Sequence, residues 1–149
     1  NIRSVFLSMR HAHPLLKAAG GAIVNVSSVH AVATSANIAA YAASKGALLA
    51  FTRATAIEFG PDHIRVNAIL PGAVDTPMLH EGLSRGHIAG ASLDELMRGL
   101  GGRHVMGRVG SPDEIGSAIV FLADNDQSGF MTGQDLIVDG GALCRLSTE

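Results

Sequence analysis

Apolar residues recur at helical spacing over the first 17 residues of the chain. They fall at positions three or four apart, which places them on one face of a helix and predicts an amphipathic helix there. Pro14 is expected to disturb its last turn, and Gly20-Gly21 to end it. The face consists of Val5, Phe6, Met9, Ala12 and Leu16.

Two short apolar runs rich in β-branched residues predict buried strands. The first is Ala22–Val26, which is closed by Ser27-Ser28. The second is Ile64–Leu70, and Pro71-Gly72 ends it. Because both runs are apolar at successive positions, each strand is expected to be covered on both faces.

An Ala-rich apolar stretch from residue 40 to Phe59 lies between these strands and predicts a long helix, with Gly60-Pro61 as its stop. Strand, helix and strand in this order form a βαβ unit. The two strands are therefore expected to be parallel, with a right-handed crossover.

The segment from Thr76 to Gly110 is Gly-rich and too long for an ordinary connection, so it is interpreted as a lid, at about residues 77–110. Ser92 to Glu95 reads as a capping box that starts a short helix. Its apolar residues suit either a wall for a small apolar substrate or the packing of the lid helices themselves. They are Met78, Leu79, Leu83, Ile88, Leu93, Leu96 and Met97.

Ser111-Pro112-Asp113-Glu114 is a stronger helix start, and that helix is expected to run to about Asp124. A polar loop over residues 125–133 and a third strand at Asp135–Val138 follow, and Asp139-Gly140-Gly141 closes that strand. The order of elements predicts the α/β class: a partial doubly wound Rossmann fold, in one domain, with a parallel sheet and flanking helices. Ligands of such sheets bind beyond the carboxyl ends of the strands.

Composition excludes several classes of protein. The 149 residues are 47% hydrophobic and 16% charged with a net charge of −2, which indicates a globular domain and no footprint for nucleic acid or an acidic membrane. One cysteine, Cys144, excludes an intrachain disulfide, and a reducing cytoplasm is the expected location. No apolar run approaches a membrane span. Since the chain begins at Asn1 without Met, it is interpreted as a fragment.

Candidate chemistry lies at Tyr41 and Lys45, four residues apart and so on one helical face. A phenol ordinarily titrates near pH 10, and a neighbouring cation favours its ionised form. The pair therefore suits proton transfer on a rigid element. A half-buried tyrosine beside a solvated lysine, without chemistry, is the alternative. Metal binding is not expected, because His11 and His13 point to different helical faces and His80 and His87 lack clustered carboxylates.

Taken in order, five motifs resemble the C-terminal half of the short-chain dehydrogenase/reductases. The resemblance covers essentially the whole chain but lacks the N-terminal Gly-rich turn that binds the cofactor's pyrophosphate, and also lacks the residue that selects NAD or NADP. The motifs are Asn1–Phe6, Ile23–Ser28, Tyr41–Lys45, Asn67–Thr76 and Thr132–Asp135 leading into Val138–Gly141.

The resemblance implies a catalytic set and a nicotinamide cofactor, NAD or NADP. Tyr41 would be the general acid/base, with Lys45 favouring its ionised form and binding the nicotinamide ribose. Ser28, thirteen residues before Tyr41, would hold the substrate oxygen, with Ser27 as its competitor. Asn1 would sit mid-helix and link to Lys45 through its backbone and a water. The loop facing the nicotinamide would use Pro71, Gly72, Val74 and Thr76.

The expected reaction is the interconversion of a small secondary alcohol and a ketone. The resemblance also implies a homodimer or homotetramer built through the Tyr41–Phe59 helix. The first strand, without neighbours from a preceding half, is expected to leave one edge of the sheet unpaired. The isolated chain is therefore not expected to be a competent enzyme. The alternative is a catalytically silent fragment that acts only in oligomerisation or interaction.

Overall fold

The computed structural model describes residues 1–84 and 92–144, so His87 and Ile88 of the expected lid lie outside the described residues. The helices and strands alternate as the sequence predicts. They are α1 (Ile2–Lys17), β1 (Gly21–Val26), α2 (Ala39–Phe59), β2 (Ile64–Pro71), α3 (Pro77–Ser84), α4 (Leu93–Gly101), α5 (Pro112–Ala123), α6 (Asn125–Ser128) and β3 (Asp135–Val138), with short 3₁₀ turns η1 (Val29–Ala31) and η2 (Gly60–Asp62).

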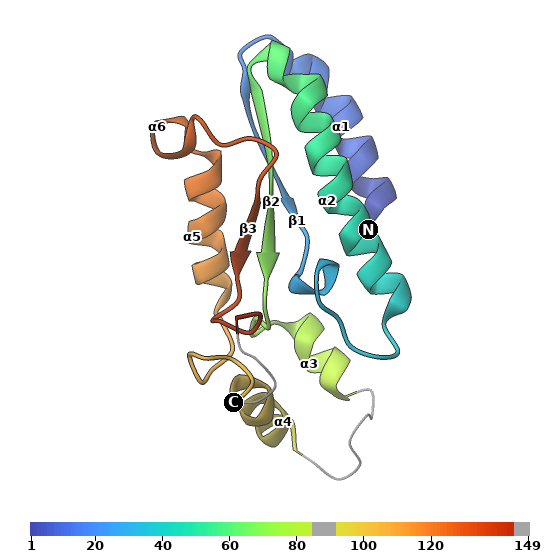
Figure 1. The fold of residues 1–149 in the computed structure, drawn as a ribbon, viewed down its shortest axis with the longest axis vertical. Coiled ribbons are helices and arrows are strands. Elements are labelled where there is room, and N and C mark those ends of the chain that lie inside the picture. Colours follow the sequence, from blue (N-terminus) through green and yellow to red (C-terminus); the bar gives the residue numbers. More distant parts are fainter. Residues whose placement is uncertain (85–91, 145–149) are drawn as a thin grey trace.

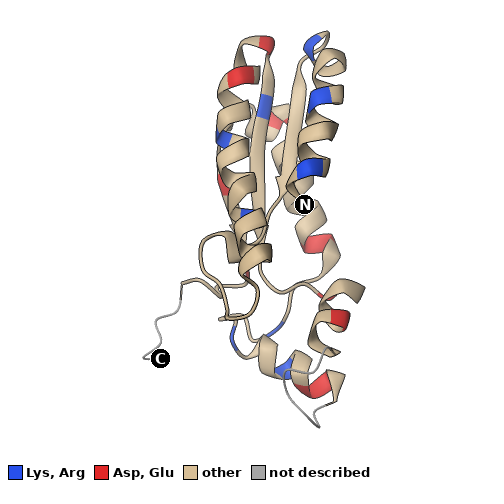
Figure 2. Ribbon diagram, turned by 90° about the vertical axis from the view of Figure 1, so that its right-hand side faces the viewer, with Lys and Arg blue, Asp and Glu red and all other residues tan. Residues whose placement is uncertain are grey.

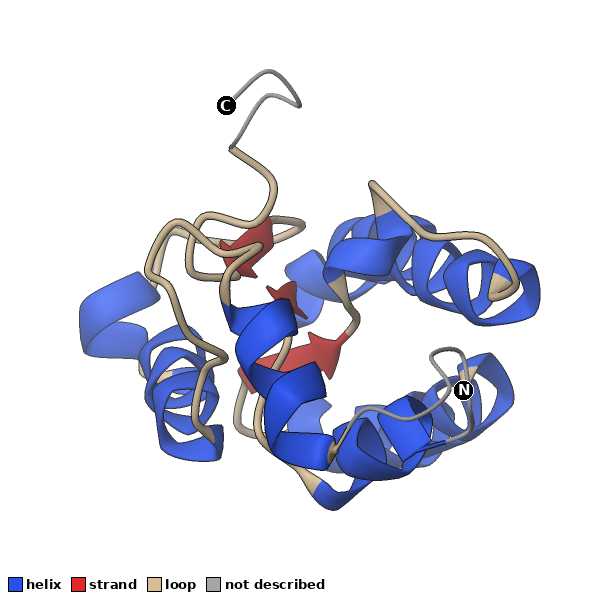
Figure 3. Cartoon of the chain, turned by 90° about the horizontal axis from the view of Figure 1, so that it is seen from below, coloured by secondary structure: helices blue, strands red, loops and turns tan. Residues whose placement is uncertain are grey.

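The three strands form one parallel sheet in the order β1-β2-β3. Figure 1 shows α1 and α2 on one side of the sheet and α5 on the other, and the view from below in Figure 3 shows the strands between these helical layers. The predicted α/β class and the parallel βαβ unit are confirmed. The carboxyl ends of all three strands meet at the lower edge in Figure 1, where α3 and α4 lie.

The central strand β2 is buried at every position from Ile64 to Leu70. Val66, Ala68, Ile69 and Leu70 are each 0% exposed, because α2 covers one face of the strand and α5 the other. Burial on both faces explains why most residues of this strand are apolar. Only Arg65 and Asn67 are polar, and both are buried with hydrogen-bond partners.

The first strand lies at an edge of the sheet, as the sequence predicts. β1 pairs with β2 on one side only among the described residues, and Val26 at its end is 45% exposed. A hollow of about 290 Å³ lies between α1 and β1, lined by side chains that include Val5, Met9 and Ile23.

One local expectation is wrong. Residues 125–133 are not wholly a loop, because the Asp124 side chain caps the short helix α6. The residues after Ser28 form the turn η1, which the Ser28 side chain caps. The helix α2 ends at Phe59, as the Gly60-Pro61 stop predicts; Gly60 keeps a right-handed backbone (φ −54°), and His63 takes the left-handed conformation (φ +58°). Pro61 lies in the turn η2, and the chain changes direction only after this turn, at His63, where it enters β2.

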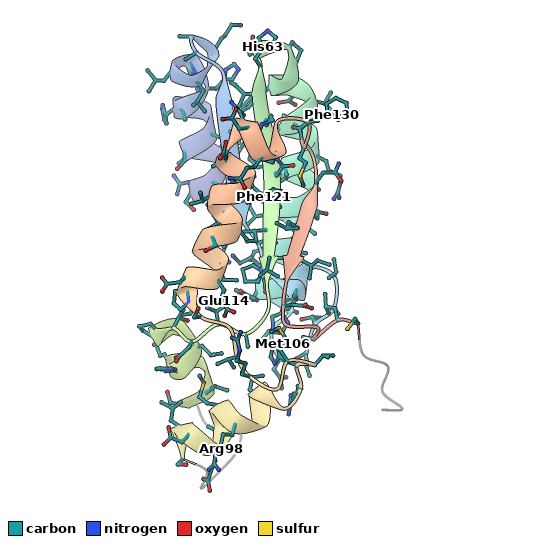
Figure 4. The ribbon with its side chains drawn as sticks, turned by 90° about the vertical axis from the view of Figure 1, so that its left-hand side faces the viewer. His63, Arg98, Met106, Glu114, Phe121 and Phe130 are labelled. Carbon is teal, nitrogen blue, oxygen red and sulfur yellow. The ribbon has the colours of Figure 1, made fainter. Side chains whose placement is uncertain are left out.

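The predicted capping box at Ser92 and the predicted helix start at Ser111 are both confirmed, and the second is also a capping box. Ser92 and Glu95 exchange side-chain and backbone hydrogen bonds at the start of α4, and Ser111 and Glu114 do the same at the start of α5. Glu114 also pairs with Arg108, whose Nη1 and Nη2 lie 2.8 and 2.6 Å from its carboxylate oxygens. Figure 4 shows Glu114 at this helix start, above the segment that carries Met106. The Arg108 guanidinium, with the Ser111 backbone, lowers the pKa of Glu114 to about 2.

Lys and Arg are the charged residues of α1, whereas both signs occur on the other long helix, α2 (Figure 2). No helix in the described part of the chain is long and apolar enough to cross a membrane. Nor do the side chains of three His, Cys, Asp or Glu residues gather there into a group that could hold a metal ion.

Arg65 is the residue of this fold whose role the sequence analysis missed. Its buried guanidinium donates to the carbonyl oxygens of Leu122 (2.9 Å) and Ala123 (3.2 Å) at the end of α5, and its Nε donates to Asn125 Oδ1 (2.8 Å). The last carbonyls of a helix lack partners within the helix, and a cation there also complements the helix dipole. Arg65 therefore fastens α5 to the central strand.

Replacing Arg65 with Met is expected to lower the free energy of unfolding by about 2–4 kcal/mol, because buried carbonyl groups lose their donors. Chemical denaturation measures the change. Arg53→Met is the matched control: Arg53 is an exposed arginine with one ion pair, to Asp135 at 3.1 Å, and its loss should cost under about 1 kcal/mol. Equal effects of the two substitutions would contradict the role given to Arg65.

Replacing Glu114 with Gln keeps a capping-box residue and removes the charge. Because the pKa of Glu114 falls from 4.5 to about 2 in the folded protein, its ionic contribution to stability is present above pH 4.5 and is lost as the pH falls toward 2. Denaturation curves across this range should show wild type and variant differing at pH 7 and converging near pH 2. Glu95→Gln, in the capping box without an arginine partner, should show a smaller difference at pH 7.

Candidate active site

The first turns of α2 carry Tyr41 and Lys45, and the structure brings their side chains together. Lys45 Nζ lies 5.7 Å from the centre of the Tyr41 ring. Both residues are half-buried. Burial lowers the pKa of the Lys45 ammonium from its ordinary value.

Lys45 is anchored to the carboxyl end of β1. Its Nζ donates a hydrogen bond to the Val26 carbonyl oxygen at 2.9 Å. An ammonium group has three donors, so this bond leaves two N–H groups for a ligand. The Tyr41 hydroxyl has no hydrogen-bond partner among residues 1–84 and 92–144. Free donors of this kind suit the hydroxyls of a ribose and the oxygen of an alcohol.

The two serines after β1 make different contacts. Ser27 Oγ donates to the Lys45 carbonyl oxygen at 2.8 Å, so its proton is engaged within the fold. Ser28 Oγ accepts a hydrogen bond from the His30 backbone N–H at 3.2 Å, and its own proton has no acceptor within the described ranges. Ser28 is thus the serine whose hydroxyl can donate to a bound oxygen.

Asn1 reaches α2 through Ser44 rather than through Lys45. Its Nδ2 donates to Ser44 Oγ at 2.7 Å, and Ser44 Oγ donates to the Tyr41 carbonyl oxygen at 2.7 Å. Asn1 is the residue that precedes the first turn of α1.

The loop after β2 holds the remaining predicted residues. Pro71 ends the strand, and Val74 pairs with Gly110 in an isolated parallel bridge. Thr76 Oγ1 accepts from the Leu79 backbone N–H and donates to the Val74 carbonyl oxygen, both at 3.3 Å, so it caps α3. The Val74 N–H is without a partner among the described residues and can reach a ligand.

Gly72 is required by packing within the protein. A Cβ atom there would lie 2.8 Å from Asp139 Cα, and the Gly72 N–H donates to the Val138 carbonyl oxygen at 3.0 Å. The backbone at Gly72 therefore lies close to the backbone that follows β3.

His104 is a residue of this region that the sequence analysis left without a role. It is 4% exposed; its Nδ1 lies 2.9 Å from the Leu100 carbonyl oxygen, and its Nε2 accepts a 3.4 Å hydrogen bond from the Ala73 N–H. These partners require the neutral tautomer with the proton on Nδ1. His104 thereby ties the end of α4 to the loop between Gly72 and Val74. No sequence signal pointed to it, since Ala73 is distant along the chain.

Comparison with known proteins identifies the family of this chain. A family model described as "Enoyl-(Acyl carrier protein) reductase" matches residues 1–142. The chain belongs to the short-chain dehydrogenase/reductase family. Among its relatives is a cyclopentanol dehydrogenase of Comamonas testosteroni, 42% identical over 142 residues, which are 95% of this chain and 53% of the relative.

Two further proteins are similar to this chain. A trans-4-hydroxycyclohexanecarboxylate dehydrogenase of Sinomonas cyclohexanicum is 43% identical over 136 residues, covering 91% of this chain and 46% of the relative. The ligand-free structure of Thermoplasma acidophilum aldohexose dehydrogenase superposes with a TM-score of 0.89 at 32% identity, over 96% of this chain and 56% of that one. The chain thus spans about half the length of the relatives it matches.

Replacing Gly72 with Ala is expected to lower the free energy of unfolding by about 1–3 kcal/mol, because the new Cβ would press on the Asp139 backbone. Gly82→Ala is the control: Gly82 is an exposed helical glycine of α3 with nothing within 4 Å of its added Cβ, and the change should stabilise by up to about 1 kcal/mol. Chemical denaturation of both variants measures the effects. A stable Gly72→Ala protein would show that the packing with Asp139 does not restrict this position.

Proposed function

We propose that the protein to which this chain belongs is an NAD(P)-dependent oxidoreductase that interconverts a secondary alcohol and a ketone. The observation that carries the proposal is the placement of Lys45 Nζ beside the Tyr41 ring, with unengaged donors on both residues. The two relatives named above as dehydrogenases of cyclic alcohols support a small alcohol or ketone as the substrate.

In the proposed reaction Tyr41 passes a proton to or from the substrate oxygen, and Lys45 favours the ionised phenol. The Ser28 hydroxyl donates a hydrogen bond to the same oxygen, where negative charge develops in the transition state. The nicotinamide, when bound, would supply or accept the hydride. Ser27 takes no part, because its hydroxyl is already bonded to the Lys45 carbonyl.

The proposed cofactor, NAD or NADP, would lie along the carboxyl edge of the sheet. Tyr41 and Lys45 would bind its ribose, and the loop after β2 would face its ring through Pro71, Gly72, Val74 and Thr76. The free N–H of Val74 supports this role of the loop. The Thr76 hydroxyl is engaged at the start of α3, so its contribution would require a shared hydrogen bond.

We further propose a homodimer or homotetramer that forms through α2. Ile57 on this helix is 79% exposed, and large apolar side chains so exposed are common at subunit interfaces. A cytoplasmic location is proposed because Cys144 is free and exposed, as a reducing compartment permits.

Tyr41→Phe tests the proposal, because it removes only the hydroxyl. In the protein with its whole dinucleotide-binding domain, kcat for alcohol oxidation should fall by about 10²–10⁴-fold, the usual contribution of a general acid/base. The melting temperature should stay near that of wild type, since the hydroxyl has no partner in the described fold. Unchanged turnover would favour the alternative of a catalytically silent interaction module.

The adjacent serines provide a matched pair for the same assay. Ser28→Ala should lower kcat, with a loss of stability limited to its 3.2 Å capping bond in the short turn η1. Ser27→Ala should lower the melting temperature through loss of the hydrogen bond to α2, with a smaller effect on kcat. The reverse pattern would assign the substrate oxygen to Ser27.

A further inference from the structure

His30 contacts both of the residues whose hydroxyls are assigned to the substrate oxygen. Its backbone N–H donates to Ser28 Oγ at 3.2 Å. Its ring meets the Tyr41 ring edge-on, with 5.8 Å between the ring centres and 75° between the planes. One residue, held in the turn η1, therefore joins the end of β1 to the start of α2.

The His30 ring and the Lys45 side chain both lie beside the Tyr41 ring. Ala40, Ala42 and Ala43, the nearest residues along the helix, have small side chains. The Lys45 side chain is flexible, and its Nζ lies 5.7 Å from the ring centre. An edge-on pair of aromatic rings is an attractive geometry and restricts the rotation of each ring.

The His30 ring is itself fixed. Its Nδ1 lies 3.2 Å from Thr34 Oγ1 within the same loop. Burial lowers the pKa of the His30 imidazole from its ordinary value, which favours the neutral ring. A neutral ring in this place leaves Lys45 as the cation beside Tyr41.

We propose that His30 is a positioning residue, which orients the Ser28 hydroxyl through its main chain and the Tyr41 phenol through its ring. The inference deepens the proposed function and rests on it, because it concerns the two hydroxyls that would meet the substrate oxygen. His30 itself transfers no proton. It raises the fraction of time in which the Ser28 and Tyr41 hydroxyls both point toward the substrate oxygen.

Substitutions of the ring test the proposal, because the backbone N–H that bonds to Ser28 is kept in any non-proline variant. His30→Ala should lower kcat about tenfold, equivalent to about 1.4 kcal/mol, and change KM for the dinucleotide by less than about twofold, because only the aim of Tyr41 changes. His30→Phe keeps an aromatic edge and should restore kcat to within about threefold of wild type, the gain expected of an aromatic pair. His11→Ala, at an exposed histidine of α1, is the control and should match wild type.

A second measurement does not depend on turnover. In the whole protein labelled with ¹³C-tyrosine, the ring resonances of Tyr41 are identified by their loss in Tyr41→Phe. In His30→Ala they should shift and narrow toward those of a freely rotating ring, and in His30→Phe and His11→Ala they should stay close to wild type. Unchanged resonances in His30→Ala would overturn the proposal.

The kinetic outcomes separate this inference from the proposed function. Full turnover in Tyr41→Phe would reject the function itself. Loss of turnover in Tyr41→Phe with full turnover in His30→Ala would reject only the positioning role. Equal losses in His30→Ala and His30→Phe would also reject it, because the imidazole nitrogens rather than the ring edge would then be required.

Discussion

The candidate site depends on a reciprocal pair of hydrogen bonds between β1 and α2. Lys45 Nζ donates to the Val26 carbonyl oxygen, and Ser27 Oγ donates to the Lys45 carbonyl oxygen. The side chain of each element thus bonds to the backbone of the other, which fixes both the rotation of α2 about its axis and its position along the strand. The Tyr41 phenol and the Lys45 ammonium meet at the carboxyl edge of the sheet because this pair holds the helix there.

The same edge collects the loop after β2, and here the constraint is steric. Gly72 allows the end of β2 to lie against the Asp139 backbone, and His104 ties Ala73 to the end of α4. Behind the edge, Arg65 fastens α5 to the central strand. The site therefore stands on three strand ends whose helices are fixed by separate polar contacts, while apolar burial around β2 supplies the general stability.

The sequence predicted those features that are encoded locally. The periods of apolar residues gave the helices and strands, and the Ser-x-x-Glu pairs at Ser92 and Ser111 gave two helix starts that the structure confirms. It did not predict contacts between residues that lie far apart along the chain, or backbone conformations that differ little from the expected ones. Arg65 bonds to residues about sixty positions away, and the short helix α6 begins within the loop expected over residues 125–133. The contact of Tyr41 with Lys45 was predictable because it spans one helical turn, whereas the ring contact of Tyr41 with His30 crosses from a loop.

The different contacts of Ser27 and Ser28 could be predicted from their successive positions along an extended chain. Side chains alternate along a strand, so Asn25 and Ser27 share a face of the chain and Ser28 takes the other. Asn25 Nδ2 donates to Thr52 Oγ1 on α2 (2.8 Å), and Ser27 bonds to Lys45 on the same helix, two helical turns earlier. The positions that point toward α2 are therefore used to attach it, and a serine in that series has its hydroxyl engaged. Ser28 falls outside the series, which leaves its hydroxyl to the loop and to whatever binds at the strand end. Two adjacent, chemically identical residues thus acquire different roles because the backbone of an extended chain turns its side chains alternately.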